Sequence, residues 1–351
     1  MAIEATSVDE IYQEMQKKLG KLIPDMEFRY KAELAYEINT LKKERGAVIL
    51  GHNYMEPALY LAVADIVGDS LELARLAKET NYDPIVFCGV RFMAETAKIL
   101  SPEKTVLLPA KKAGCSLAES ITAEDVIKLK VKYPGVPVVT YVNTYSDVKA
   151  ESDICCTSSN ASKVVMSLKS EKVIFLPDEY LARNVARETG KKIIFPTKVP
   201  KSKKLKSESL LDYELIGWHG KCEVHELFSV QDIEDVRNQF PDVVILAHPE
   251  CKPDVVEASD FSGSTSKMID YVKEKNSPRY LLLTECSMGD NIIAENPEKE
   301  ILRLCSHRCP HMAEITLEDT LKSLQLNRYQ IEVPEEIRVR AVKAIDRMLE
   351  I

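Results

Sequence analysis

Three of the nine cysteines occupy corresponding positions in the chain, and together they could bind a metal group. Each follows a short apolar run and precedes an acidic residue by four or five positions; they are Cys115, Cys222 and Cys309. Thiolates repel one another unless a cation shares their charge, so three that converge predict a metal site. Three ligands leave one position open, either on a zinc ion or on one iron of a 4Fe-4S cluster, which normally takes four cysteines.

The same threefold register holds for an aspartate and a hydroxyl residue five positions later. The pairs are Asp65 with Ser70, Asp153 with Ser158, and Asp260 with Thr265. A helix is expected to begin at each hydroxyl residue, where free backbone N–H groups and the helix dipole favour anions. Three such helix ends could hold carboxylates or a phosphate, and ordinary helix capping is the alternative for any one of them.

A polar triplet follows the first strand of each repeat and supplies groups for acid–base catalysis and hydrogen bonding. The triplets are His52-Asn53-Tyr54, Tyr141-Val142-Asn143 and His248-Pro249-Glu250. A lone histidine is usually a satisfied core residue, but His52 and His248 occupy the same place in two repeats. We therefore expect the triplets to face the same cavity as the three cysteines.

The elements that must position these side chains alternate between short apolar runs and helical patterns, which indicates a parallel α/β fold. Two helices are expected within residues 8–46, and strands at 47–50, 85–88, 106–108, 138–142, 173–176, 243–247 and 280–283. Three pseudo-symmetric units of about 100 residues would surround a central cavity at the carboxyl ends of their strands. The expected domains are 1–130 with the N-terminal helices, 131–237, and 238–351 with a C-terminal helix.

Composition excludes several classes of function. The net charge of -8 argues against a nucleic-acid partner, and no apolar run is long enough to predict a membrane span. No G-x-G-x-x-G or P-loop motif follows a strand, so a familiar nucleotide site is unsupported. The polar N-terminal segment predicts a cytoplasmic protein in a reducing compartment, where disulfides are rare. A lysine-rich stretch at 191–206 is expected to be a solvated insertion.

The remaining six cysteines lack the register of the first three and are expected to be inert, since cysteine is often buried. They are Cys88, Cys155, Cys156, Cys251, Cys286 and Cys305. Cys305 is the strongest competitor for a metal, because it lies four residues before Cys309. That spacing fits neither a C-x-x-C metal knuckle nor a redox pair.

In their order along the chain, these motifs resemble the quinolinate synthase family of NAD biosynthesis. The resemblance rests on GHNY, VGDSLELARLA, AGCSLA, VVTYVNT, ICCTSSNA, GKCEVH, HPEC, GSTSKMIDYV and CPHMAEITL, between about residues 45 and 320. It implies three α/β domains around one 4Fe-4S cluster held by Cys115, Cys222 and Cys309. It also implies condensation of iminoaspartate (iminosuccinate) with dihydroxyacetone phosphate to quinolinate, phosphate and water, with the open iron as a Lewis acid.

The resemblance further implies which residues bind the substrate and move protons. Substrate contacts are implied for His52, Ser70, Tyr141, Val142, Asn143, Ser158, His248, Pro249, Glu250 and Thr265; catalytic roles are implied for Tyr54, His52, His248 and Glu250. An L-aspartate oxidase or dehydrogenase would supply the iminoaspartate. Two departures from the family pattern are Met55, where glutamine is common, and Cys309, which lacks the C-x-x-C neighbours of a regulatory disulfide.

Two other functions remain open from the residues alone. One is a zinc-dependent lyase or hydrolase that uses the same three thiolates and a bound water. The other is a non-catalytic iron–sulfur sensor or carrier. A sensor rarely needs a cavity lined by histidine, tyrosine, asparagine and glutamate side chains, so the polar residues favour an enzyme.

Overall fold

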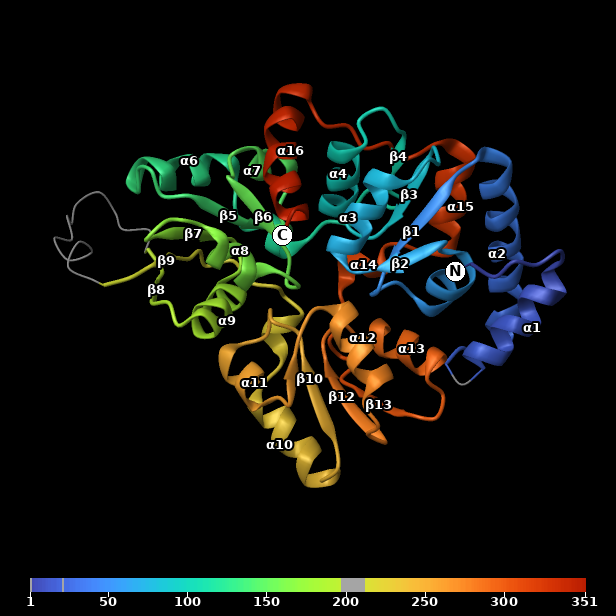
Figure 1. Cartoon of the computed structure of the whole chain (residues 1–351). Helices are drawn as coiled ribbons and strands as arrows, with labels where there is room; N and C mark the ends of the chain where they lie inside the picture. The colour runs from blue at the N-terminus through green and yellow to red at the C-terminus, as the bar shows by residue number, and fades with distance from the viewer. Residues whose placement is uncertain (1, 21, 197–211) are drawn as a thin grey trace.

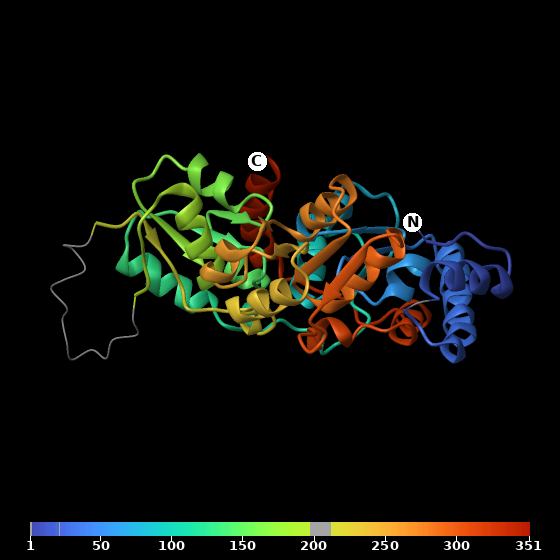
Figure 2. The ribbon, with the colours of Figure 1, turned by 90° about the horizontal axis from the view of Figure 1, so that it is seen from below.

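The computed structural model describes residues 2–20, 22–196 and 212–351, which form three α/β units, each built on one sheet of parallel strands. The first sheet has the order β2-β1-β3-β4, the second β6-β5-β7-β9-β8 and the third β11-β10-β12-β13. In Figure 1 the units occupy the corners of a triangle, and Figure 2 shows that this triangle is flat. The expected α/β class with three short parallel sheets is thereby confirmed.

Each unit contains the strands that the apolar runs predict and further short strands that the sequence did not reveal. The predicted ones are β1 (Val48–His52), β3 (Ile85–Cys88), β4 (Val106–Leu107), β5 (Val138–Tyr141), β7 (Val173–Leu176), β10 (Val244–Ala247) and β12 (Arg279–Leu283). The additional ones are β2 (Ile66–Gly68), β6 (Ile154–Cys156), β8 (Ile193–Ile194), β9 (Leu215–Ile216), β11 (Phe261–Ser262) and β13 (Glu300–Arg303). Most are too short to show an alternating pattern.

Helices cover the sheets and connect the strands. In the first unit they are α1 (Val8–Leu19), α2 (Asp25–Arg45), the π-helix η1 (Leu59–Val63), α3 (Ser70–Glu79), α4 (Arg91–Leu100) and α5 (Ser116–Glu119). The second contains α6 (Ala123–Lys132), α7 (Ser146–Ala150), α8 (Ala161–Ser167), α9 (Glu179–Thr189) and the 3-10 helix η3 (His225–Leu227). The third contains α10 (Val230–Gln239), α11 (Pro253–Ala258), α12 (Thr265–Glu274) and α13 (Cys286–Glu295), and α14 (Pro310–Ala313), α15 (Leu317–Leu326) and α16 (Glu335–Leu349) follow.

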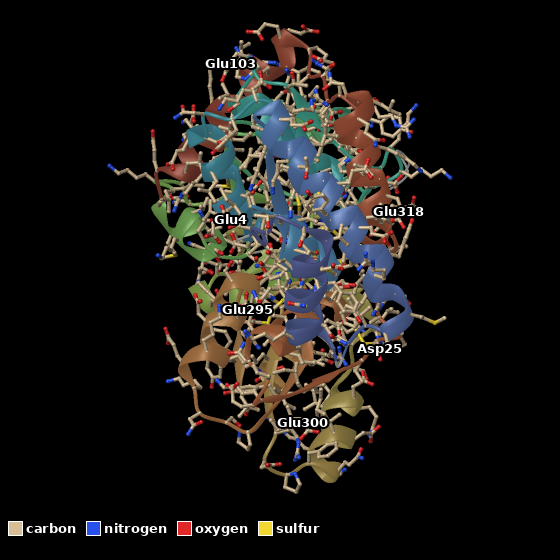
Figure 3. All side chains as sticks on the ribbon, turned by 90° about the vertical axis from the view of Figure 1, so that its right-hand side faces the viewer. Glu4, Asp25, Glu103, Glu295, Glu300 and Glu318 are labelled. Atoms are coloured by element: carbon tan, nitrogen blue, oxygen red, sulfur yellow. A yellow bond between two sulfur atoms is a disulfide. The ribbon has the colours of Figure 1, made fainter. Side chains whose placement is uncertain are left out.

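The two ends of the chain pack on the outside of the core. The two predicted N-terminal helices are α1 and α2, and α2 ends at Gly46, whose φ of 62° is the left-handed conformation that glycine favours. Figure 3 faces these helices, with Asp25 at the start of α2 and Glu318 in α15, which packs beside α2. Helix α16 lies against α7 and β6, so the chain crosses to the second unit after leaving the third. The domain boundaries stay a prediction.

The repeated aspartates stabilise the first strand of each unit. The Oδ2 atoms of Asp65, Asp153 and Asp260 accept hydrogen bonds of 2.8 Å from the N–H groups of Ile49, Val138 and Ile245, respectively. Each aspartate N–H also donates to the carbonyl of that same strand residue, at 2.9 to 3.0 Å. The threefold register of these aspartates is therefore structural.

Neutralising these aspartates is expected to destabilise the first unit more than the third. Asp65 pairs with the ammonium of Lys42 at 2.7 Å, and the Lys42 side chain is only 5% exposed, whereas Asp260 pairs with the half-exposed Arg237. Asp65→Asn leaves a buried charge unpaired and should lower the free energy of unfolding by about 3 kcal/mol. Asp260→Asn should cost about 1 kcal/mol. Urea denaturation of both variants measures the difference, and equal losses would contradict this interpretation.

The lysine-rich stretch is only partly covered by the structure. Residues 191–196 contain β8, which pairs with β9 and extends the second sheet to five strands. Residues 197–206 lie outside the described residues, so the expected solvated insertion stays a prediction. No helix within the described ranges combines the length and the apolar character that crossing a membrane requires.

Candidate active site

A cavity lies where the three units meet, and residues of all three units line it. All predicted site residues except Val142 and Pro249 line it: His52, Tyr54, Ser70, Cys115, Tyr141, Asn143, Ser158, Cys222, His248, Glu250, Thr265 and Cys309. The three repeats thus bring the triplets, hydroxyls and thiols to one place.

Val142 and Pro249 lie in the same loops, but their backbone groups form hydrogen bonds with neighbouring elements. The N–H of Val142 donates to the carbonyl of Cys156 at 2.8 Å, and the carbonyl of Pro249 accepts from the side chain of Asn184 at 2.8 Å. Neither residue lines the cavity. Their roles as substrate contacts stay a prediction.

The three predicted ligand cysteines are free thiols, and each comes from a different connection. Cys115 immediately precedes α5, Cys222 lies three residues before η3, and Cys309 immediately precedes α14. Burial raises the pKa of Cys115 to about 12 and that of Cys309 to about 11, and burial also raises the pKa of Cys222 well above its usual value. Such thiols become thiolates at neutral pH only when a cation offsets their burial.

The spacing of the thiols suits a larger group than one ion. Among the described residues, one set of metal-binding side chains is close enough to share an ion: Cys222, His225 and Glu250, whose ligand atoms lie within 4.8 Å of one another. The three cavity thiols form no such set in that part of the chain. Ligands of one tetrahedral zinc ion lie about 3.8 Å apart. The three thiols are therefore not all close enough to one another to share one ion as they stand.

Two of the remaining cysteines form a disulfide, so the expectation that the chain has none is wrong. Cys286, at the start of α13, is bonded to Cys305, with their Cα atoms 5.1 Å apart. The parallel pairing of β12 with β13 brings these distant residues together, which sequence spacing cannot reveal. Cys305 is therefore not a free competitor for the metal, and its bond tethers the segment that leads to Cys309.

A chain of hydrogen bonds crosses the cavity wall and involves two residues that the sequence analysis did not select, His225 and Thr284. The hydroxyl groups of Tyr54 and Thr284 lie 2.6 Å apart, and Thr284 Oγ1 lies 3.0 Å from His225 Nε2. His225 Nδ1 lies 2.9 Å from Glu250 Oε2. Because an ionised Glu250 accepts from Nδ1–H, Nε2 is left as the acceptor for the Thr284 hydroxyl. Tyr54, Thr284 and His225 can therefore each donate a hydrogen bond to the next side chain, and the series ends at Glu250.

Glu250 is held as a buried anion at the end of this chain. Its Oε1 accepts from the Tyr141 hydroxyl at 2.5 Å and from Asn143 Nδ2 at 3.3 Å. Burial alone would raise the pKa of Glu250, but the nearby His225 and His248 and the Tyr141 hydrogen bond outweigh it and bring the pKa to about 2. Burial raises the pKa values of Tyr54 and Tyr141 well above their usual range, so both keep their protons at rest.

His52 and His248 are expected to be neutral in the resting protein. Burial lowers the pKa of His52 to about 4, and burial together with the neighbouring His225 lowers that of His248 to about 3. A base with a lowered pKa stays unprotonated above that value, so neither ring should titrate between about pH 5 and pH 8. NMR of isotope-labelled histidines in the metal-free protein tests this, with His52→Asn and His248→Asn identifying the signals. A titration midpoint near 6.5 for either ring would contradict this result.

The structure changes the expected role of the three hydroxyl residues. The side chain of Asp69 caps α3 and that of Ser264 caps α12, so Ser70 and Thr265 are not needed as caps. The expectation that a helix begins at Ser158 is wrong, because a turn closed by Asn160 intervenes and α8 begins at Ala161. Two of the three hydroxyl residues therefore open a helix that another side chain caps, and all three line the cavity.

His225 and Thr284 could have been found from weak signals in the sequence. His225 is the last residue of the GKCEVH motif, and Thr284 directly follows β12. Asn53 completes the first triplet, and its side chain donates to Thr265 Oγ1 at 2.9 Å. These contacts join residues more than fifty positions apart, so no local pattern predicts them.

The fold and the cavity indicate an enzyme, since a pocket combines three free thiols with a directed chain of acid–base groups. Over residues 36–350 the sequence matches the family described as quinolinate synthetase A protein. Quinolinate synthase 2 of Mesorhizobium japonicum is 52% identical over 95% of both chains. Quinolinate synthase of Xylella fastidiosa is 54% identical over 89% of this chain and 85% of its own. The chain belongs to the quinolinate synthetase A family.

Proposed function

We propose that this enzyme is a cytoplasmic quinolinate synthase of NAD biosynthesis, which condenses iminoaspartate with dihydroxyacetone phosphate to quinolinate, phosphate and water. Relatives named quinolinate synthase align with most of this chain. One of them, from Agrobacterium fabrum, is 51% identical over 95% of this chain. The cavity carries the proposal, because three thiols line it together with the hydrogen-bonded series of side chains that begins at Tyr54 and ends at Glu250.

Cys115, Cys222 and Cys309 would hold one 4Fe-4S cluster. Their free thiols, their different connections and their wide spacing suit a cluster that is held by three residues. When bound, the cluster would supply a Lewis acid through the iron that no cysteine holds. His225 Nδ1 also lies 3.2 Å from the Cys222 sulfur, so the ligand and the acid–base groups are in contact.

The hydroxyl groups of Ser70, Ser158 and Thr265 would bind the anionic groups of the substrates. They line the cavity from three segments, and Asn53 fixes the orientation of Thr265 by donating to its oxygen. His52 and His248, held neutral by burial, can each donate one N–H and accept one proton. Tyr141 and Asn143 would add further donors beside Glu250.

Tyr54 would be the group that moves a proton at the reacting atoms. As Tyr54 takes a proton from the substrate, its own hydroxyl proton would pass to Thr284 Oγ1 and the Thr284 hydroxyl proton to His225 Nε2. The anion of Glu250 would stabilise the resulting imidazolium. Reversal of these transfers returns the proton to an oxygen or nitrogen of the substrate. Condensation, ring closure and dehydration each need such transfers, and the position of Tyr54 in the cavity lining supports this role.

The substrate also implies a partner. Iminoaspartate contains an imine, which water hydrolyses, so an L-aspartate oxidase or dehydrogenase would have to produce it close to its point of use. We propose a functional link to such an enzyme.

An anaerobic turnover assay tests the proposed function. Protein purified without oxygen should convert dihydroxyacetone phosphate and iminoaspartate, generated in situ, into equal amounts of quinolinate and phosphate. An intact iron–sulfur protein that yields no quinolinate would instead support the sensor or carrier reading.

A further inference from the structure

Lys149 is a fully buried lysine directly behind the cavity wall. It lies in α7, the helix that follows the loop containing Tyr141 and Asn143, and its exposed fraction is 0%. The other buried lysine in the described residues, Lys42, forms an ion pair with Asp65 at 2.7 Å. No ion pair in the described chain includes Lys149, although an unpaired buried charge costs several kcal/mol. Such a cost suggests that the charge has a role.

The ammonium of Lys149 holds the loop that carries two of the cavity residues. Nζ donates to the carbonyl of Thr144. Thr144 in turn donates through its hydroxyl to the carbonyl of Tyr141 at 3.2 Å and through its N–H to the carbonyl of Val142 at 2.8 Å. Tyr141 and Asn143 are the donors that hold Glu250. Lys149 is therefore connected, through the loop backbone, to the position of the Glu250 carboxylate.

The charge of Lys149 also reaches the cavity. Nζ lies 5.5 Å from the centre of the Phe92 ring, and Phe92 lines the cavity, so about one aromatic ring separates the ammonium from the substrate space. The cavity itself is lined by no lysine or arginine among the described residues. Burial lowers the pKa of Lys149, whereas the nearby Cys155, Glu95 and Asp147 raise it. The Glu95 carboxylate is itself bonded to Arg91 and to the N–H of Ser146.

We propose that Lys149 is a positioning residue with two effects: its ammonium fixes the loop of Tyr141 and Asn143, and its charge favours anions in a cavity without a cationic side chain of its own. The identity of those anions, two carboxylates and a phosphate, rests on the proposed function. At about 9 Å and an effective dielectric constant near 20, one charge changes the binding of one anionic group by roughly ten- to twentyfold.

Two variants separate the effects, and both are measured in the cluster-containing enzyme. Lys149→Met removes the charge and the hydrogen bond, whereas Lys149→Gln keeps a donor for the Thr144 carbonyl without the charge. Both should raise the KM for dihydroxyacetone phosphate and the inhibition constant of inorganic phosphate by about tenfold. Only Lys149→Met should also lower kcat by tenfold or more. If Lys149→Met does not fold, Lys149→Gln still tests the effect of the charge.

Lys42→Met is the matched control, because it removes the other buried lysine without touching the cavity. It should lower stability and leave KM and phosphate inhibition unchanged. Wild-type values of both constants in Lys149→Gln would overturn the charge effect, and a wild-type kcat in Lys149→Met would overturn the loop effect. If the wild-type protein makes no quinolinate, the proposed function fails, and phosphate binding to the same variants by calorimetry still tests the effect of Lys149.

Discussion

Replacing Cys115, Cys222 or Cys309 singly by serine is expected to abolish cluster binding and lower turnover at least a thousandfold. The serine hydroxyl is a poor ligand for iron, and with two thiolates left the cluster has too few protein ligands to be retained. Each variant should contain almost no iron or acid-labile sulfide after anaerobic purification. Loss of the cluster rather than of the fold would appear as a near-native circular dichroism spectrum.

Cys88→Ser is the control for these three variants. Cys88 is a buried free cysteine that contacts Thr320 and does not line the cavity. It should keep a full complement of iron and sulfide with at most a modest loss of stability. Retention of a full complement in all three cavity variants would exclude these cysteines as the ligands.

Replacing Glu250 by glutamine is expected to lower kcat by about a thousandfold while the cluster stays in place. Glutamine keeps the size of the side chain but cannot stabilise a protonated His225, whose Nδ1 lies 2.9 Å from Glu250 Oε2. Without this stabilisation, the hydrogen-bonded series of side chains can no longer accept the proton of Tyr54. Stopped or steady-state production of quinolinate, together with iron content, measures the effect.

Glu257→Gln is the matched control on α11, because Glu257 is exposed and forms only a weak contact with Arg187 at 3.8 Å. It should have wild-type activity. A Glu250→Gln enzyme that keeps more than about a tenth of the wild-type kcat with an intact cluster would contradict the relay from Tyr54 to Glu250.

The repeat made much of the site predictable from the sequence. Cys115, Cys222 and Cys309 share a register, and the structure brings all three to one cavity. Such predictions succeed because equivalent loops of a parallel sheet leave its strands at the same edge. The aspartates of the repeat have a structural role instead. Asp65, for example, accepts a hydrogen bond from Ile49 in the first strand of its own unit.

What the sequence could not predict depends on contacts between distant segments. His225 and Thr284 meet only because the second and third units face each other, and the bond between Cys286 and Cys305 forms only because β12 and β13 are neighbours. The prediction that a helix begins at Ser158 failed for a local reason, because the Asn160 side chain closes a turn before α8 begins at Ala161. The position of Lys149 behind Phe92 likewise needed the packed structure.

The most direct test of the central claim is the metal and sulfide content of the wild-type protein purified without oxygen. About four iron atoms and four acid-labile sulfides per chain are expected, with little zinc. One zinc atom per chain and no sulfide would contradict it and would favour a zinc enzyme that uses the same cavity.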